Sequence, residues 1–252
     1  MSETLLQIDG LRKTFDGVLA LEDFSCAVGK GEIVGLIGPN GAGKTTLFNV
    51  ATGFLRPEHG RIAFKGRQVL DLPPYRISRA GIARTFQNLR LIRQISVLEN
   101  VLLAFPDQPG ERLGNVFFRW RASRTREAEN RRLAMSLLAD ASLSEKADDP
   151  AEVLSYGQQK LLSLVCCLAV GAELLLLDEP VGGIAPAMIE NILTIIRDLP
   201  KQGKSVVFIE HNLEAVIQIC DRVIFMDAGR KISEGTPEQV RNDPRVMEAY
   251  ID

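Results

Sequence analysis

One glycine-rich stretch constrains the fold of this chain more than any other feature. It reads Gly38-Pro39-Asn40-Gly41-Ala42-Gly43-Lys44-Thr45-Thr46. An apolar run precedes it and a helical pattern follows, which predicts a turn between a buried strand and a helix. Glycines let the backbone wrap with its N–H groups pointing inward, and a helix N-terminus adds a dipole that favours an anion. We therefore expect a phosphate-binding loop, with Lys44 reaching the β- and γ-phosphates of a nucleotide and the Thr45 hydroxyl binding Mg²⁺.

A pair of acids provides the second signal. Asp178 and Glu179 follow the apolar run 174–177, at the carboxyl end of a predicted strand, where open α/β sheets form their binding crevices. Asp178 is suited to hold Mg²⁺, directly or through water, and Glu179 to accept a proton from an attacking water. The alternative interpretation is that both acids only cap the next helix. Taken with the phosphate loop, the pair indicates a P-loop NTPase.

Short apolar runs alternate with helical patterns along most of the chain, which predicts an α/β core with a largely parallel sheet. With the two motifs above, this resembles the RecA-like core of P-loop NTPases. Buried strands are expected at residues 33–37, 82–86, 174–178, 205–209 and 223–226. Shorter runs without intervening helices predict a small antiparallel β layer, at residues 5–8, 19–28 and 61–64. Helical periodicity at 97–104 and 127–141 predicts an inserted helical subdomain at residues 88–153 within a single domain, 1–252.

Two local signals mark the end of the chain. Residues 227–230 read Asp-Ala-Gly-Arg, which predicts a hairpin turn. Thr236, Pro237 and Gln239 then match a capping box with proline in the first helical turn, so a short helix is expected there.

Composition limits the compartment and the partners. The 252 residues carry 30 Lys and Arg against 32 Asp and Glu, a net charge of −2, so no global field attracts nucleic acid or anionic lipid. The four cysteines show no metal-binding or disulfide spacing, which fits a reducing compartment. The most apolar stretch, 161–177, is interrupted by Gly171 and Glu173, so we expect no membrane span. The N-terminus lacks a secretory pattern, and a cytoplasmic location is expected.

A third motif narrows the family. Leu154-Ser155-Tyr156-Gly157-Gln158-Gln159 lies 21 residues before Asp178 (178 − 157). It resembles the signature motif of ATP-binding cassette (ABC) ATPases, with Tyr156 where many members have glycine. Ser155 and Gln158 also form a capping box that exposes the start of a helix, which is a second anion site. The alternative is that Ser155 only caps this helix.

The remaining cassette positions occur in the order that the resemblance implies. Phe15 matches the aromatic residue that stacks on adenine, and Gln87 matches the glutamine that contacts the metal and water and couples to a membrane partner. His211 matches the histidine that contacts the γ-phosphate. Each has a plain structural alternative: a core aromatic, a polar loop residue and a histidine beside a helix.

Within the superfamily, the chain is similar to the LivG-type ATPase subunits of branched-chain amino acid importers. The similarity rests on residues 81–88, on Gly53-Phe54 and on the ending Glu248-Ala249-Tyr250. Importers of urea and other amides share these features. Ala185 stands where the family usually has asparagine, which puts in question a polar contact across the dimer interface. The helix after the signature is also more apolar than usual.

The resemblance implies an ATPase that works as a head-to-tail dimer with ATP and Mg²⁺ between two subunits. Ser155, Gly157 and Gln158 of one subunit would face the nucleotide of the other. The second subunit is either a sister ATPase or a second copy. Integral membrane permease subunits and, indirectly, an extracytoplasmic solute-binding protein are implied as partners, with the ATPase peripheral at the cytoplasmic face of the inner membrane.

Two other classes of protein compete with this interpretation. Seven arginines between residues 112 and 132, with Phe117, Phe118 and Trp120 among them, could mark a nucleic-acid surface, and a cassette acting on nucleic acid or ribosomes is the alternative. No long coiled coil, zinc cysteines or second cassette supports it. We expect a solvated face that partly contacts the permease or lipid headgroups, and no nucleic acid. A P-loop GTPase or kinase is disfavoured because no Asn-Lys-x-Asp sequence occurs.

Overall fold

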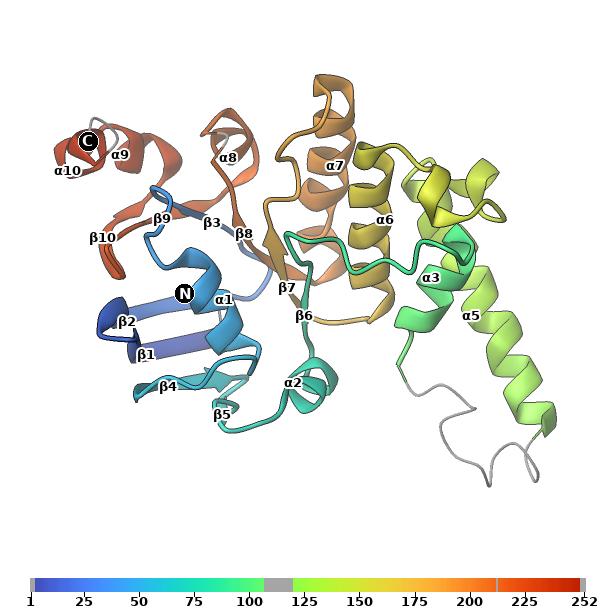
Figure 1. Ribbon diagram of the computed structural model, residues 1–252, viewed down its shortest axis with the longest axis horizontal. Helices are drawn as coiled ribbons and strands as arrows, with labels where there is room; N and C mark the ends of the chain where they lie inside the picture. The colour runs from blue at the N-terminus through green and yellow to red at the C-terminus, as the bar shows by residue number, and fades with distance from the viewer. Residues whose placement is uncertain (1–2, 107–119, 212, 250–252) are drawn as a thin grey trace. The chain divides into compact units, whose positions relative to one another are not determined.

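The computed structural model describes residues 3–106, 120–211 and 213–249. The chain forms two compact units (Figure 1). The first comprises Met1–Gln87, Ala172–Gly182 and Ile196–Asp252, and the second comprises Asn88–Gly171 and Gly183–Ile195.

A six-stranded sheet forms the base of the first unit. Its strands are β3 (Ile33–Ile37), β6 (Ile82–Arg84), β7 (Leu174–Asp178), β8 (Ser205–Ile209), β9 (Arg222–Asp227) and β10 (Arg230–Gly235). Their order is β10-β9-β3-β8-β7-β6, and all neighbours are parallel except β10 and β9. Every residue of β3, β7 and β8 is buried, as expected for parallel strands covered on both faces. The predicted parallel core is confirmed.

Strand β6 is shorter than the sequence predicts, because it ends at Arg84 and not at Phe86. The Thr85 N–H still donates to the Leu176 carbonyl at 3.0 Å. The Asp178 N–H, however, donates to the Thr85 hydroxyl at 2.9 Å, so a side chain replaces the main-chain acceptor. The ladder therefore stops, and the chain leaves the sheet before it reaches Gln87.

The predicted antiparallel layer is a four-stranded sheet with the order β2-β1-β4-β5. Its strands are β1 (Thr4–Phe15), β2 (Val18–Gly29), β4 (His59–Phe64) and β5 (Arg67–Gln68). The first two are longer than the apolar runs suggested, because they continue as a paired hairpin beyond the buried residues.

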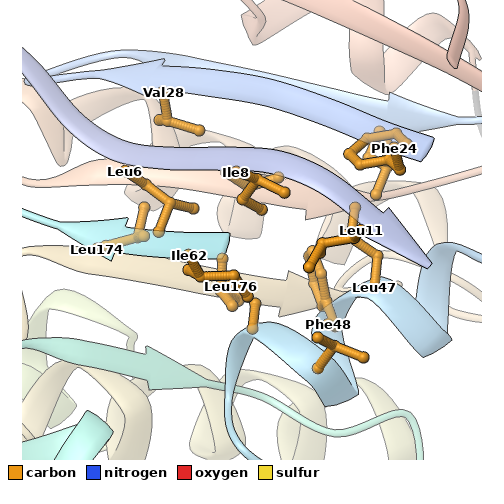
Figure 2. Packing of buried hydrophobic residues seen from close by; sticks show 14 of the residues in the cluster. Leu6, Ile8, Leu11, Phe24, Val28, Leu47, Phe48, Ile62, Leu174 and Leu176 are labelled. Atoms are coloured by element: carbon orange, nitrogen blue, oxygen red, sulfur yellow. The ribbon is translucent and has the colours of Figure 1, made fainter. Parts of the chain in front are cut away.

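The core of the first unit lies between its two sheets (Figure 2). Leu6 and Ile8 of β1 and Ile62 of β4 pack with Leu174 and Leu176 of β7. Helix α1 (Lys44–Ala51), which follows the phosphate loop, adds four buried side chains to the same cluster, of which Leu47 and Phe48 are the largest. Each buried side chain of this size contributes about 1.5–3 kcal/mol relative to exposure. This packing holds the start of α1 against the sheet.

Helices dominate the second unit. They include α3 (Val97–Ala104), α5 (Trp120–Asp140), the 3₁₀ turns η2 (Ser144–Lys146) and η3 (Ala151–Val153), and α6 (Tyr156–Ala169). Helix α3 packs against both α5 and α6. Capping boxes start α3 at Ser96 and α6 at Ser155, and the second was predicted. The pattern at 127–141 corresponds to α5, which begins earlier and ends one residue sooner, at Asp140.

The remaining helices are α2 (Pro74–Ala80), α7 (Pro186–Asp198), η4 (Pro200–Gln202), α8 (Leu213–Ile219), α9 (Pro237–Arg241) and α10 (Pro244–Glu248). The predicted capping box of Thr236 and Gln239 starts α9, and the predicted hairpin turn joins β9 to β10. The four cysteines form no disulfide. Among the described residues, none of the helices has both the length and the apolar character that a bilayer span requires.

Candidate functional site

Four predicted site segments follow four strands that are neighbours in the six-stranded sheet. The phosphate loop follows β3, Gln87 comes after β6, Glu179 after β7 and His211 after β8. Because these strands are parallel, their carboxyl ends lie along one edge of the sheet. Ligands of α/β folds bind at such an edge.

These segments line one cavity of about 260 Å³. Its lining residues are Ala20, Asn40, Gly41, Ala42, Gly43, Lys44, Thr45, Thr46, Gln87, Glu179 and His211. All of them except Ala20 were predicted as site residues. Ala20 lies in β2 and approaches the loop through its backbone carbonyl, so its side chain gave no signal in the sequence.

Close backbone contacts explain two of the loop glycines. Gly38 has φ 147°, and a Cβ there would lie 1.9 Å from the carbonyl oxygen of Met226 in β9. Gly43 has φ 97°, and its Cβ would lie 2.3 Å from the carbonyl oxygen of Ala20. The Gly229 N–H of the β9–β10 turn donates to the Ala42 carbonyl at 3.0 Å. The loop is thus held against β2 and the β9–β10 hairpin.

Lys44 is the buried cation of the cavity, with 6% of its surface exposed. Its ammonium donates to the carbonyl oxygens of Gly38 and Pro39, both at 2.7 Å. Burial lowers the pKa of Lys44, and the charges of Glu179 and Asp178 oppose this shift. A phosphate in the loop would offer this ammonium a charge-assisted hydrogen bond, which is stronger than a bond to a neutral carbonyl.

Glu179 is held from two sides by residues of neighbouring loops. The Gln87 side-chain amide donates to one carboxylate oxygen at 3.2 Å, and His211 Nε2 lies 3.1 Å from the other. The backbone of Glu179 has φ 48°, a left-handed conformation that costs about 1–3 kcal/mol in a residue other than glycine. Strain of this kind is concentrated at functional positions.

Two charged residues at this edge were missed by sequence reasoning. Arg84 forms a buried ion pair with Asp178, with Nη2 and Oδ2 2.9 Å apart. Glu210 is 1% exposed and accepts hydrogen bonds from the N–H groups of Val181 at 2.8 Å and His211 at 3.2 Å. A charge directly after the apolar run 205–209 was the available signal for Glu210.

Phe15 and the signature residues were predicted as site residues but do not line this cavity. Phe15 is 41% exposed, carries the Lys13 ammonium 5.2 Å from its ring centroid, and is not among the residues that line the cavity. Ser155, Gly157 and Gln158 belong to the second unit. There the Gln158 N–H donates to the Ser155 hydroxyl at 3.3 Å, and a Cβ at Gly157 would lie 3.0 Å from Met188 Cγ.

The arginine-rich stretch is described only in part. Arg112 and Arg119 lie outside the described residues, as do Phe117 and Phe118. Arg126, Arg131 and Arg132 of α5 are exposed, as expected for a solvated face.

Family models match two parts of the chain. Residues 21–182 match the ABC transporter family, and residues 230–251 match the branched-chain amino acid ATP-binding cassette transporters. The high-affinity branched-chain amino acid transport ATP-binding protein LivG of Salmonella typhimurium is 38% identical over 252 residues, which cover 100% of this chain and 99% of the relative. The corresponding protein BraF of Pseudomonas aeruginosa is 36% identical with the same coverage.

Solved structures agree with these relatives. A nucleotide-free ATP-binding cassette from an ABC transporter matches with a TM-score of 0.86 at 33% identity, covering 99% of this chain and 100% of the other. The ADP conformation of an ABC transporter cassette matches with a TM-score of 0.85 at 33% identity, covering 99% of both chains. The predicted fold class and resemblance are confirmed, and an action on nucleic acid or ribosomes is not favoured. The chain belongs to the ATP-binding cassette transporter family, as an ATP-hydrolysing cassette related over its full length to branched-chain amino acid transport ATP-binding proteins.

Proposed function

We propose that this ATPase energises the import of branched-chain amino acids, or of a related small polar solute such as urea or an amide, through a membrane permease. One observation carries the proposal: four neighbouring strand ends bring a phosphate loop, two polar side chains and a carboxylate to one cavity. The names of the full-length relatives supply the class of solute.

The loop from Gly38 to Thr46 binds the phosphates in this proposal. Its backbone N–H groups and the N-terminus of α1 favour an anion, and Lys44 transfers its ammonium from loop carbonyls to the β- and γ-phosphates. Phe15 offers an exposed ring on which an adenine can stack.

Of the three predicted Mg²⁺ ligands, Thr45 and Gln87 line the cavity, and Asp178 lies buried at the end of β7, directly before Glu179. The Thr45 hydroxyl, the Gln87 amide oxygen and the Asp178 carboxylate are hard oxygen donors, and Mg²⁺ sites of this kind take the rest of their ligands from phosphates and water. When bound, Mg²⁺ would neutralise charge that develops between the β- and γ-phosphates.

Glu179 acts as the general base for hydrolysis. Its carboxylate accepts a proton from the attacking water, while the Gln87 contact at 3.2 Å and the His211 contact at 3.1 Å keep it oriented. His211 also reaches the γ-phosphate as a donor, and Gln87 orients the water. Because these side chains are already oriented before the reaction, little reorganisation of the site is needed to reach the transition state.

A second ATPase subunit completes the site. In the proposed head-to-tail dimer, Ser155, Gly157 and Gln158 at the start of α6 approach the γ-phosphate of the other subunit, where the N-terminus of this helix favours an anion. The partner is a sister ATPase or a second copy of this chain.

The whole chain, 1–252, is one ABC ATPase domain in this proposal, with residues 88–153 as a helical insertion. Permease subunits contact the insertion and the segment after Gln87, at the cytoplasmic face of the membrane, and the solute-binding protein acts through them.

Isolation of the tagged chain from solubilised membranes tests the proposal. Integral membrane permeases should co-purify, and leucine, isoleucine or valine with a binding protein should stimulate ATP hydrolysis in the reconstituted complex. A Lys44→Ala variant should assemble without hydrolysing ATP, and Lys30→Ala, which removes an exposed lysine, should behave as wild type. Recovery of RNA or DNA in place of permeases, or unchanged hydrolysis by Lys44→Ala, would contradict the proposal.

A further inference from the structure

Two segments that mark the narrower resemblance of this chain meet around Arg84. The ring of Phe54, from one segment, contacts the ring of Phe86, from the other, edge to face at 5.6 Å. The Arg84 guanidinium lies 5.0 Å from the centroid of Phe86 and 5.4 Å from that of Phe48 in α1. Both distances are within the range of cation–π attraction, so aromatic rings cover a cation next to the cavity.

The polar contacts of Arg84 join the phosphate-loop helix to the acidic strand end. Nη1 donates to the Asn49 side-chain oxygen of α1 at 2.6 Å, and Nη2 donates to Asp178 Oδ2 at 2.9 Å. The side chains of Arg84 and Asp178 are 4% and 1% exposed. Burial of a carboxylate costs free energy unless a counter-charge and hydrogen bonds accompany it, and Arg84 supplies both to Asp178.

We propose that Arg84 is a positioning residue for Mg²⁺: it holds the Asp178 carboxylate in the orientation in which it takes part in binding the metal with the nucleotide. This inference rests on the metal-binding role proposed for Asp178. Carboxylates at metal sites are oriented by hydrogen-bond partners in this way, and loss of such a partner lowers metal affinity about 10–100-fold.

The geometry also explains why position 84 requires arginine and not lysine. A planar guanidinium directs two N–H groups to two acceptors at once, whereas a lysine ammonium is a point charge on a flexible stem. Lysine at this position would keep the charge but could not bridge Asn49 and Asp178 with the same geometry.

The affinity of the purified full-length chain for ADP, measured with Mg²⁺ and again with EDTA, tests the proposal without turnover. For Arg84→Met, we expect the ADP affinity in EDTA to stay within about twofold of wild type, because the phosphate loop is intact. The gain in affinity on adding Mg²⁺ should shrink about 10–100-fold. Arg84→Lys should show a smaller but measurable loss, and it covers the case in which the methionine variant does not fold.

Arg222 provides the matched control, because its guanidinium also binds a carboxylate, Glu32 at 2.7 Å, away from the cavity. Arg222→Met should lose stability but keep the full Mg²⁺ gain. A full Mg²⁺ gain in Arg84→Met or Arg84→Lys, or an equal loss in Arg222→Met, would overturn the inference. Absence of any Mg²⁺ gain in the wild type would instead contradict the proposed metal site itself.

Discussion

Substitution of alanine for Gly38 should destabilise the fold more than the same change at Gly41, although both glycines lie in the phosphate loop. Gly41 has φ 83°, and a Cβ there meets nothing within 4 Å. Gly38 has φ 147°, and its Cβ would lie 1.9 Å from the Met226 carbonyl oxygen. Both variants suffer backbone strain, but only Gly38→Ala adds a collision with β9.

The size of the difference follows from the displacement that the collision requires. Real Cβ contacts are essentially never below 3.0 Å, so the loop or β9 must move by at least 1.1 Å (3.0 − 1.9). Strain alone costs about 1–2 kcal/mol at Gly41. Moving β9 away from its parallel partner β3 weakens about two ladder hydrogen bonds, at about 0.5–1.5 kcal/mol each. We expect Gly38→Ala to be the less stable variant by about 1–3 kcal/mol.

Urea unfolding of the two variants, followed by circular dichroism at equal protein concentration, measures this difference in the free energy of unfolding. ADP binding to the folded protein should also weaken more in Gly38→Ala. Equal stability of the two variants would refute the argument that β9 fixes the loop through a contact that excludes a side chain.

Three further predictions concern buried or capped polar groups. In Glu210→Gln, one amide oxygen replaces two carboxylate oxygens, so the N–H of Val181 or of His211 loses its acceptor. We expect lower kcat with little change in KM in an ATPase assay, and wild-type kcat would contradict a role of Glu210 in placing His211. Burial acts to raise the pKa of Glu32, but the Arg222 guanidinium and a backbone N–H outweigh it and keep the pKa below 4.5. Glu32 therefore contributes stability above pH 4.5 that is lost as the pH falls through its native pKa. Arg222→Met should reduce the loss of stability on acidification, measured as the urea unfolding midpoint at several pH values. A loss as large as in the wild type would contradict the role of Arg222 in lowering the pKa of Glu32. Ser155→Ala should cost about 1 kcal/mol in urea unfolding because it removes the cap of α6, and no loss would show that packing alone fixes the start of the helix.

The parts of the fold that depend on local pattern could be predicted from the sequence. The limits of β3, β7 and β8 match the predicted runs, because fully buried parallel strands are mostly apolar and polar residues, Asp178 in β7 and Ser205 in β8, occur only at their ends. Strand β5 and helix α2 were not predicted, since β5 is exposed and α2 has a single buried residue. Their positions are set by tertiary contacts that no periodicity reveals.

The same distinction applies to the candidate site: residues of a local motif could be predicted, and residues that depend on distant partners could not. Phosphate binding requires glycines, a lysine and a threonine at fixed spacing within one short segment, so the residues of the phosphate loop could be predicted. Arg84 acts through Asp178, 94 residues away in the chain, and Glu210 acts through the backbone of Val181. Pairings of this kind arise only when the sheet brings distant segments together. The sequence marks Glu210 as a charge after an apolar run, but it does not name the partner of either residue.

The most direct measurement of the central claim is ATP binding and hydrolysis by Glu179→Gln, with Glu214→Gln as a control that removes an exposed carboxylate of α8. We expect Glu179→Gln to bind ATP as wild type does while its turnover falls about 10²–10⁴-fold, and the control to keep full turnover. Hydrolysis by Glu179→Gln at a rate near that of the wild type would contradict the assignment of this cavity and its carboxylate as the centre of ATP hydrolysis.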